Sequence, residues 1–132
     1  MKAFLIPLHF TFMISGVVLL LVAAVLAFLK KEGWFKLHKV LALLGSLSAF
    51  TAFALIFLLK YKMHYPHFTS LHGIGGLTSV SLLAIVLISG FLMVKGNKPA
   101  RPVHIWMGRI TALILSGAIV SGILRFVEIF SR

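Results

Sequence analysis

Four long apolar runs dominate this sequence and leave it few ways to fold. They extend over Leu5–Leu29, Val40–Leu59, Leu71–Val94 and Val103–Leu124. Each is close to the roughly 20 residues that a helix needs to cross a bilayer. Hydrophobic residues make up 61% of the chain, which is more apolar surface than a soluble domain of this size can bury. The sequence therefore predicts an all-α membrane protein, a single domain over residues 1–132 with spans at about 5–29, 37–60, 70–94 and 103–128.

The links between the runs are short and polar, at residues 30–33, 61–69 and 95–102. Short links force neighbouring helices to run antiparallel, so we expect an up-down-up-down four-helix bundle. The first run is longer than the 7–15 apolar residues of a secretory signal, and we interpret it as a retained span. We call the side of the membrane that holds the N-terminus the N-terminal side.

Each run has a histidine near its start, followed seven residues later by a small residue. The histidines are His9, His38, His72 and His104, and the small residues are Gly16, Gly45, Ser79 and Thr111. Ionisable groups inside a span are costly and are usually functional. In an up-down bundle the first and third helices lie on one diagonal and the second and fourth on the other. His9 is thus expected to face His72 near the N-terminal side, and His38 to face His104 near the opposite side.

Two pairs of imidazoles at two depths favour two bis-histidine haem sites. The spacing agrees, since His9 and His72 are 63 residues apart and His38 and His104 are 66 apart. The second half of the chain thus loosely repeats the first, which predicts a pseudo-two-fold axis along the membrane normal.

Small residues lie on the same helical faces as the histidines, and they admit two interpretations. In membranes such stripes commonly mark tight helix packing. A flat macrocycle between helices also needs missing side chains beside its ligands. With the histidines present we favour the second interpretation, which makes Gly16, Gly45, Gly76 and Gly108 candidate cofactor-binding residues.

The histidines admit other interpretations. A single histidine at a membrane interface is more often an amphipathic anchor than a ligand. Zinc or copper is the chemical alternative, but a tetrahedral zinc site needs more ligands at one depth than a histidine pair supplies. The chain has no cysteine, so any haem is held non-covalently.

Three segments together resemble a known family. They are His38 with Gly45, residues 71–76 (LHGIGG) and residues 102–109 (PVHIWMGR), where His104, Gly108 and Arg109 form a His-x-x-x-Gly-Arg pattern. These segments are similar to the cytochrome b561 family and its ferric-reductase relatives. The resemblance implies two b-type haems with iron ligands His9 and His72 for one, and His38 and His104 for the other. It also implies electron transfer from a reductant such as ascorbate inside to an acceptor such as monodehydroascorbate or ferric iron outside. Family members often carry an extra helix at each end, and we expect the four core helices alone from these 132 residues.

Basic residues predict the orientation. The side opposite the N-terminus carries Lys30, Lys31, Lys36, Lys39, Lys95, Lys98 and Arg101, and the N-terminal side carries Lys2, Lys60, Lys62, Arg125 and Arg132. This excess predicts that the side opposite the N-terminus faces the cytoplasm. We expect an integral, multi-pass protein of a prokaryotic plasma membrane with both termini outside. Lys36 and Arg109 are candidate partners of haem propionates, or simple interfacial charges.

Several functional questions stay open at this point. His64 and His67 either bind an external metal or relay protons, or they are interfacial residues. The electron donor and the electron acceptor could each be a small molecule, a quinol or a redox protein. Three classes are open for the chain itself: a transmembrane oxidoreductase, a haem-bearing anchor subunit of a larger quinol-linked complex, or a cofactor-free transporter or scaffold. Membrane lipids are expected partners, nucleic acid is not, and a homodimer is left open.

Overall fold

The computed structural model describes residues 2–66 and 68–131, and this part of the chain contains four helices and no strand. The helices are α1 (Lys2–Leu29), α2 (Trp34–Lys62), α3 (Leu71–Val94) and α4 (Ala100–Phe130). All four are long and apolar enough to cross a membrane, over Phe4–Leu29, Trp34–Lys62, Leu71–Val94 and Ala100–Glu128. The prediction of an all-α membrane protein with four spanning helices is confirmed.

Three helices begin three residues before the expected spans, α1 at Lys2, α2 at Trp34 and α4 at Ala100. α2 starts after Gly33, whose φ of 71° is a left-handed conformation that glycine adopts readily, and α4 starts after Pro99. Apolar character ends where the membrane ends, whereas backbone hydrogen bonds continue until a residue interrupts them. The start of α3 is fixed by Ser70, whose hydroxyl accepts a hydrogen bond of 3.1 Å from the backbone N–H of Gly73.

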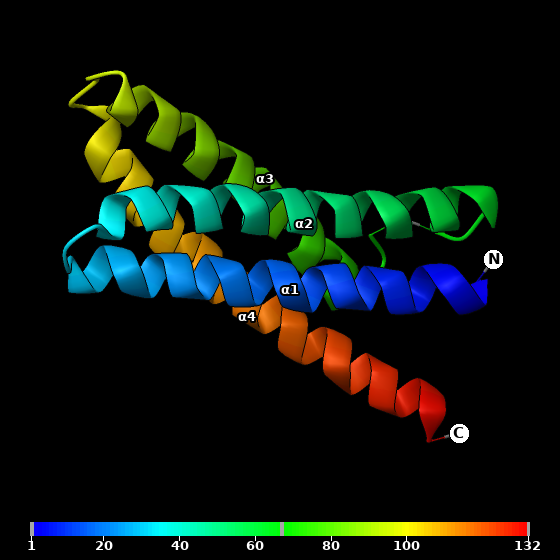
Figure 1. Ribbon diagram of the computed structural model, residues 1–132. Helices are drawn as coiled ribbons and strands as arrows, with labels where there is room; N and C mark the ends of the chain where they lie inside the picture. The colour runs from blue at the N-terminus through cyan, green and yellow to red at the C-terminus, as the bar shows by residue number, and fades with distance from the viewer. Residues whose placement is uncertain (1, 67, 132) are drawn as a thin grey trace. The chain divides into compact units, whose positions relative to one another are not determined.

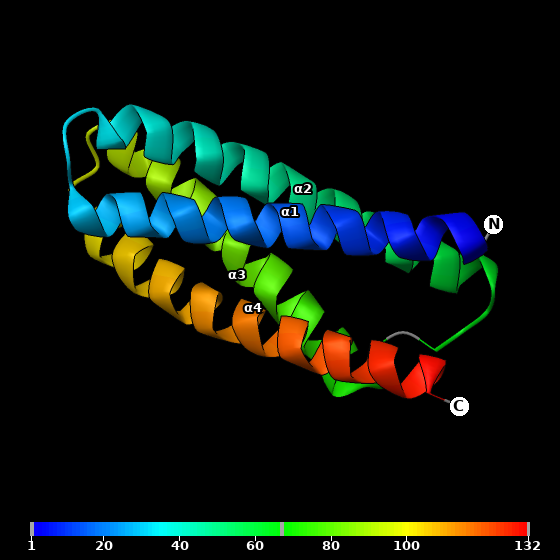
Figure 2. The same cartoon turned by 60° about the horizontal axis from the view of Figure 1, so that its bottom comes forward.

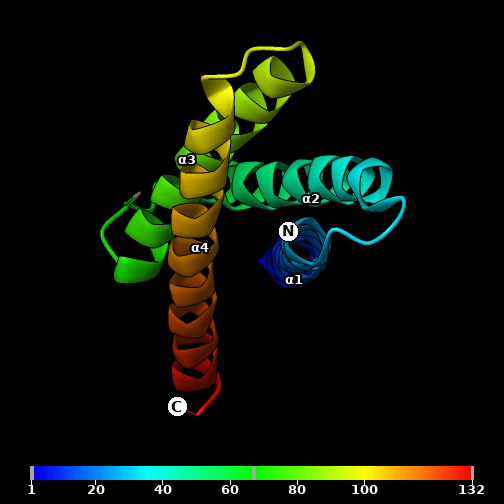
Figure 3. The ribbon, with the colours of Figure 1, turned by 90° about the vertical axis from the view of Figure 1, so that its left-hand side faces the viewer.

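The chain divides into two compact units, residues 1–65 and 66–132. Each unit is a helical hairpin, and each is described by itself. In the first hairpin, α1 and α2 lie side by side and run antiparallel (Figure 1). In the second hairpin, α3 and α4 do the same, joined by the link around Gly96 (Figures 2 and 3). The single four-helix domain, its up-down topology and its internal repeat stay predictions.

Small side chains form the interior of the first hairpin. The buried residues are Gly16, Val17 and Ala23 on α1, and Gly45, Ser46, Ala49, Ala52 and Leu59 on α2. A Cβ built on Gly16 would lie 3.0 Å from the carbonyl oxygen of Gly45, and a Cβ built on Gly45 would lie 2.9 Å from the carbonyl oxygen of Gly16. The two backbones therefore cross closely, as small residues allow in membrane helices.

The second hairpin has a similar interior. Its buried residues are Ser79, Leu83 and Ser89 on α3, and Ala100, Thr111, Leu115 and Ala118 on α4. The buried hydroxyls donate back to their own helices, as Ser79 does to the Gly75 carbonyl at 2.7 Å. In the described part of the chain every buried side-chain nitrogen and oxygen has a hydrogen-bond partner, which a lipid environment requires.

Large apolar side chains are exposed along all four helices. Phe28, Leu71 and Leu113 are 82%, 84% and 75% exposed. Such an outer surface is unfavourable in water and favourable against acyl chains. The exposed surface therefore agrees with the lengths of the helices, and both place the chain in a membrane.

Candidate functional site

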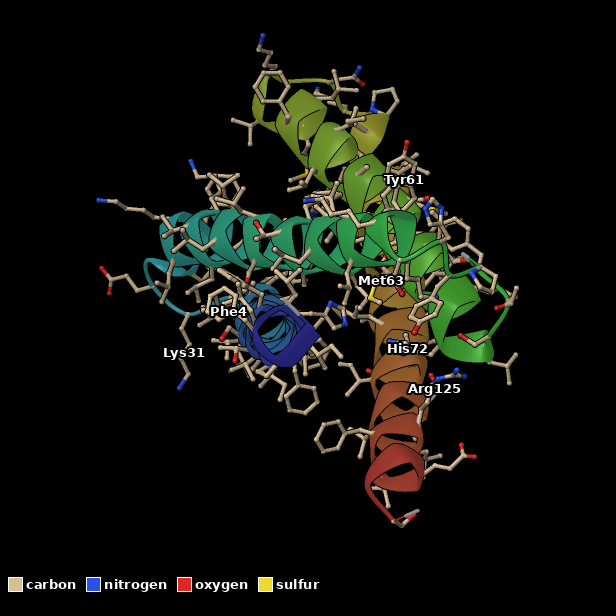
Figure 4. The ribbon with its side chains drawn as sticks, turned by 90° about the vertical axis from the view of Figure 1, so that its right-hand side faces the viewer. Phe4, Lys31, Tyr61, Met63, His72 and Arg125 are labelled. Atoms are coloured by element: carbon tan, nitrogen blue, oxygen red, sulfur yellow. The ribbon has the colours of Figure 1, made fainter. Side chains whose placement is uncertain are left out.

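Each of the four histidines is half-buried and bonds to the other helix of its own hairpin. The Nδ1 atom lies 2.8 Å from a backbone carbonyl oxygen in His9, His38 and His72, and 3.0 Å in His104. The acceptors are the carbonyls of Ala52, Ala23, Ala118 and Val86, in that order. His72, labelled in Figure 4, lies beside α4.

The four hydrogen bonds share one register. In every helix the accepting residue stands fourteen residues after the histidine, as Ala23 follows His9 and Ala52 follows His38. Each hairpin is thus closed by two reciprocal hydrogen bonds, one near each end. Fourteen residues correspond to about 21 Å of helix rise at 1.5 Å per residue. The two histidines of a hairpin are therefore separated along the helix axis by most of the thickness of a bilayer core.

This hydrogen bond also decides which ring nitrogen can act as a ligand. A carbonyl oxygen only accepts, so Nδ1 must carry the proton and donate it. In the neutral ring the lone pair then belongs to Nε2. Metal-binding histidines are held in the same way, with the remote N–H donated to a carbonyl or carboxylate that fixes the tautomer and the ring orientation. In its neutral form each of the four imidazoles therefore has its lone pair on Nε2, the nitrogen that would bind haem iron.

The glycines predicted to bind the cofactor fall into two groups. Gly16 and Gly45 contact each other's helix and form the close crossing of the first hairpin. Gly76 and Gly108 stand one turn after His72 and His104, and a Cβ built on either has nothing within 4 Å. The second group leaves open space beside a histidine on the same helix, which a flat macrocycle needs.

The basic side chains predicted to interact with propionates are exposed. Lys36 lies near the start of α2. The Arg109 guanidinium carbon lies 5.2 Å from the centroid of the Trp106 ring, a cation–π contact on α4. The Nζ of Lys39 lies over the Phe35 ring in the same way, at 4.9 Å. Such paired cations and rings are typical of membrane interfaces.

The link between α2 and α3 holds two further histidines, His64 and His67. His67 lies outside the described residues. His64 is exposed, with a positive φ of 53°. Among the described residues no group of three or more His, Asp or Glu side chains is close enough to hold a metal ion. The proposed roles of His64 and His67 stay predictions.

Sequence reasoning missed the groups that hold the histidines. The four carbonyls belong to alanine and valine residues, whose side chains carry no chemical signal. The one available signal is the constant spacing of fourteen residues between each histidine and an alanine or valine on its own helix. Ser89 and Ser121, which bond to two of these carbonyls, were missed as well.

Comparison with known proteins gives one match. Residues 8–130 match the family model described as eukaryotic cytochrome b561. No curated protein and no solved structure matches the chain. The matched residues include all four histidines and nearly the whole chain. The eukaryotic description does not support our expectation of a prokaryotic plasma membrane.

Proposed function

The chain belongs to the cytochrome b561 family, and on this premise we propose that it transfers electrons through two bis-histidine haems from a cytoplasmic reductant to an extracytoplasmic acceptor. Family membership implies haem-based electron transfer across a membrane and a b-type haem. The number of haems, their ligands and the direction of transfer are our proposal. The observation that carries it is the hydrogen bond shared by the four histidines, in which Nδ1 of each ring lies against a backbone carbonyl of the neighbouring helix.

We assign His9 and His72 to one haem and His38 and His104 to the other. The course of the chain supports this pairing. His9 bonds to Ala52, near the end of α2 that leads into the link to α3, and His72 stands in the first turn of α3 directly after that link. If every helix crosses the membrane once, both histidines belong to the N-terminal side. By the same reasoning His38 and His104 belong to the opposite side.

Bound by these histidines, the haems supply reversible one-electron chemistry at two depths of the membrane. The residues of the chain orient each imidazole ring through its hydrogen bond to a carbonyl and surround it with apolar helices. A low dielectric and a fixed hydrogen bond to the ligand are two of the means by which a protein sets a haem potential. The apolar helices also exclude water from the part of the membrane between the two depths at which the histidines lie.

We further propose that Gly76 and Gly108 leave space for the macrocycles, and that Lys36 and Arg109 interact with the propionates of the haem nearer the cytoplasm. The open space at both glycines supports the first assignment. The second depends on charge alone, since a guanidinium or ammonium group inside or near a span needs an anion or the interface. For Gly16 and Gly45 the contacts favour helix packing over a cofactor contact.

The ligand assignment is tested by counting haems in the purified protein. We expect two haems per chain in the wild type, with a low-spin spectrum in the oxidised and dithionite-reduced states. His9→Ala and His72→Ala should each lose the same haem. The double variant should still hold the other one, whereas His9→Ala with His38→Ala should hold neither. His64→Ala is the matched control and should keep both.

Two results would contradict the proposal. A wild-type protein that cannot be loaded with haem would refute the function. A His9→Ala and His72→Ala double variant without haem, beside a His9→Ala and His38→Ala variant that retains one, would refute the pairing.

Orientation has a separate test, because the chain has no cysteine and single cysteines can be introduced. Lys31, labelled in Figure 4, lies in the link between α1 and α2, and Lys62 ends α2. In sealed cells we expect an impermeant thiol reagent to label Lys62→Cys, and to label Lys31→Cys only after the membrane is permeabilised. The reverse pattern would invert the proposed direction of transfer.

A further inference from the structure

The backbone carbonyl that accepts the hydrogen bond of His72 also accepts a second hydrogen bond. The Ala118 oxygen accepts a hydrogen bond from Nδ1 of His72 at 2.8 Å and a second one from the hydroxyl of Ser121, also at 2.8 Å. A carbonyl oxygen has two lone pairs and can satisfy both donors. The next residue is Gly122, and a Cβ built there would lie 2.7 Å from Cε1 and 2.9 Å from Nδ1 of His72. The imidazole therefore rests against the backbone of α4.

The same arrangement occurs at His104, on the other helix of the hairpin. The Val86 oxygen accepts from Nδ1 of His104 at 3.0 Å and from the hydroxyl of Ser89 at 3.0 Å. A Cβ built on Gly90 would lie 3.0 Å from Cε1 and 3.1 Å from Nδ1 of His104. Two Ser-Gly pairs, Ser89-Gly90 and Ser121-Gly122, thus hold two histidines by the same contacts.

The first hairpin lacks this device. The Ser-Gly pairs stand seventeen and eighteen residues after the histidine of their own helix, and the corresponding residues of the first hairpin are Leu26-Ala27 and Leu55-Ile56. Neither leucine has a hydroxyl that could share the carbonyl, and neither Ala27 nor Ile56 leaves the space of a glycine. His9 and His38 make the carbonyl hydrogen bond without a serine donor three residues on.

We propose that the Ser-Gly pairs are positioning residues for His72 and His104. The inference rests on the proposed function. Each glycine lets the ring approach the backbone and fixes the orientation of its plane. Each serine withdraws electron density from the carbonyl that the imidazole also uses, which weakens the hydrogen bond that Nδ1–H donates to this carbonyl and makes Nε2 a weaker donor to iron. Each proposed haem then has one ligand restrained by a Ser-Gly pair and one ligand without it.

The glycine contacts are tested with Gly122→Ala and Gly90→Ala, and Gly117→Ala is the matched control because its Cβ meets nothing within 4 Å. The full-length, haem-loaded protein is measured by low-spin electron paramagnetic resonance, which responds to the angle between the ligand rings, and by redox titration. We expect Gly122→Ala to shift the signal of the His72 haem alone, or to lose that haem. Gly90→Ala should alter the His104 haem alone and to a smaller extent, because its contact is less close.

The serine contacts are tested with Ser121→Ala and Ser89→Ala, each of which removes one oxygen atom. Ser116→Ala is the control, since this exposed hydroxyl donates to the Ala112 carbonyl oxygen, whereas the four histidines bond to the carbonyls of Ala52, Ala23, Ala118 and Val86. We expect each variant to lower the midpoint potential of one haem and leave the other unchanged, while Ser116→Ala changes neither.

The possible results distinguish a failure of the positioning role from a failure of the proposed electron-transfer function. A wild type without haem refutes the proposed function. A wild type with two haems, in which Gly122→Ala and Ser121→Ala match their controls in both measurements, refutes the positioning role alone. Equal shifts of both haems would show a general loosening of the hairpin and would also refute it. If Gly122→Ala loses both haems, the potential of Ser121→Ala decides, and an unchanged value overturns the inference.

Discussion

Gly45→Ala should destabilise the first hairpin, because an added methyl group has no space between α1 and α2. A Cβ there would lie 2.9 Å from the Gly16 carbonyl oxygen, 2.9 Å from Cγ of Leu20 and 3.1 Å from Cβ of Leu19. Rotation about χ1 can move Cγ of Leu20 away, but Cβ of Leu19 and the carbonyl oxygen of Gly16 are fixed by the backbone of α1. The contact can be relieved only if the two helices move apart.

The size of the effect follows from two opposing terms. Overpacking of a filled interface costs about 1–3 kcal/mol, and we take about 3 kcal/mol because a backbone atom must move. Replacing glycine by alanine within a helix returns up to about 1 kcal/mol. We therefore expect Gly45→Ala to lower the free energy of unfolding by about 2 kcal/mol.

The assay is unfolding in mixed micelles by titration with a denaturing detergent, followed by circular dichroism. Gly117→Ala is the matched control, since its Cβ would meet nothing within 4 Å, and it should be as stable as the wild type or up to about 1 kcal/mol more stable. Equal free energies of unfolding for Gly45→Ala and Gly117→Ala would refute the close crossing. A changed haem spectrum at unchanged stability would instead return Gly45 to the cofactor site that the sequence predicted.

Two further predictions use the same titration together with a haem count. Ser70→Ala removes the hydroxyl that accepts from the Gly73 N–H and should cost about 1 kcal/mol, whereas Ser70→Asp should retain most of the cap; equal losses in both variants would contradict the capping role. Ala52→Leu adds volume at a side chain that is 0% exposed, so it should displace α1, lengthen the 2.8 Å hydrogen bond of His9 and reduce the occupancy of one haem. Ala54→Leu, at an exposed position, should keep both haems. If this control also lost a haem, the burial of Ala52 would not be the cause of the loss in Ala52→Leu.

Most of the fold could be predicted because hydrophobic run length alone selects a membrane helix. Four runs gave four helices, whose bounds differ from the expected spans by at most three residues, as at the starts Trp34 and Ala100. α2 starts after Gly33 and α4 starts after Pro99. These two residues set where helical hydrogen bonding begins, and hydropathy does not register such positions.

The candidate site was predictable in part. The four histidines are visible in the sequence because a polar ring inside an apolar run is costly and therefore rare. The carbonyls that accept their protons are not visible, since every residue has one. Glycine is ambiguous for a similar reason: Gly45 packs against a helix while Gly76 borders open space, and both leave the same signal in a sequence.

The sequence by itself determined the environment of the chain, the number of its spans and the depth of its four imidazoles along each helix, because these follow from transfer free energy and from counting residues along a chain of known rise. Only the tertiary structure decided which nitrogen of each ring donates to a carbonyl, which glycines pack against a neighbouring helix and which histidines contact a Ser-Gly pair. Those properties depend on atoms of a second helix, and the approach of two helices is set by packing that neither helix specifies alone.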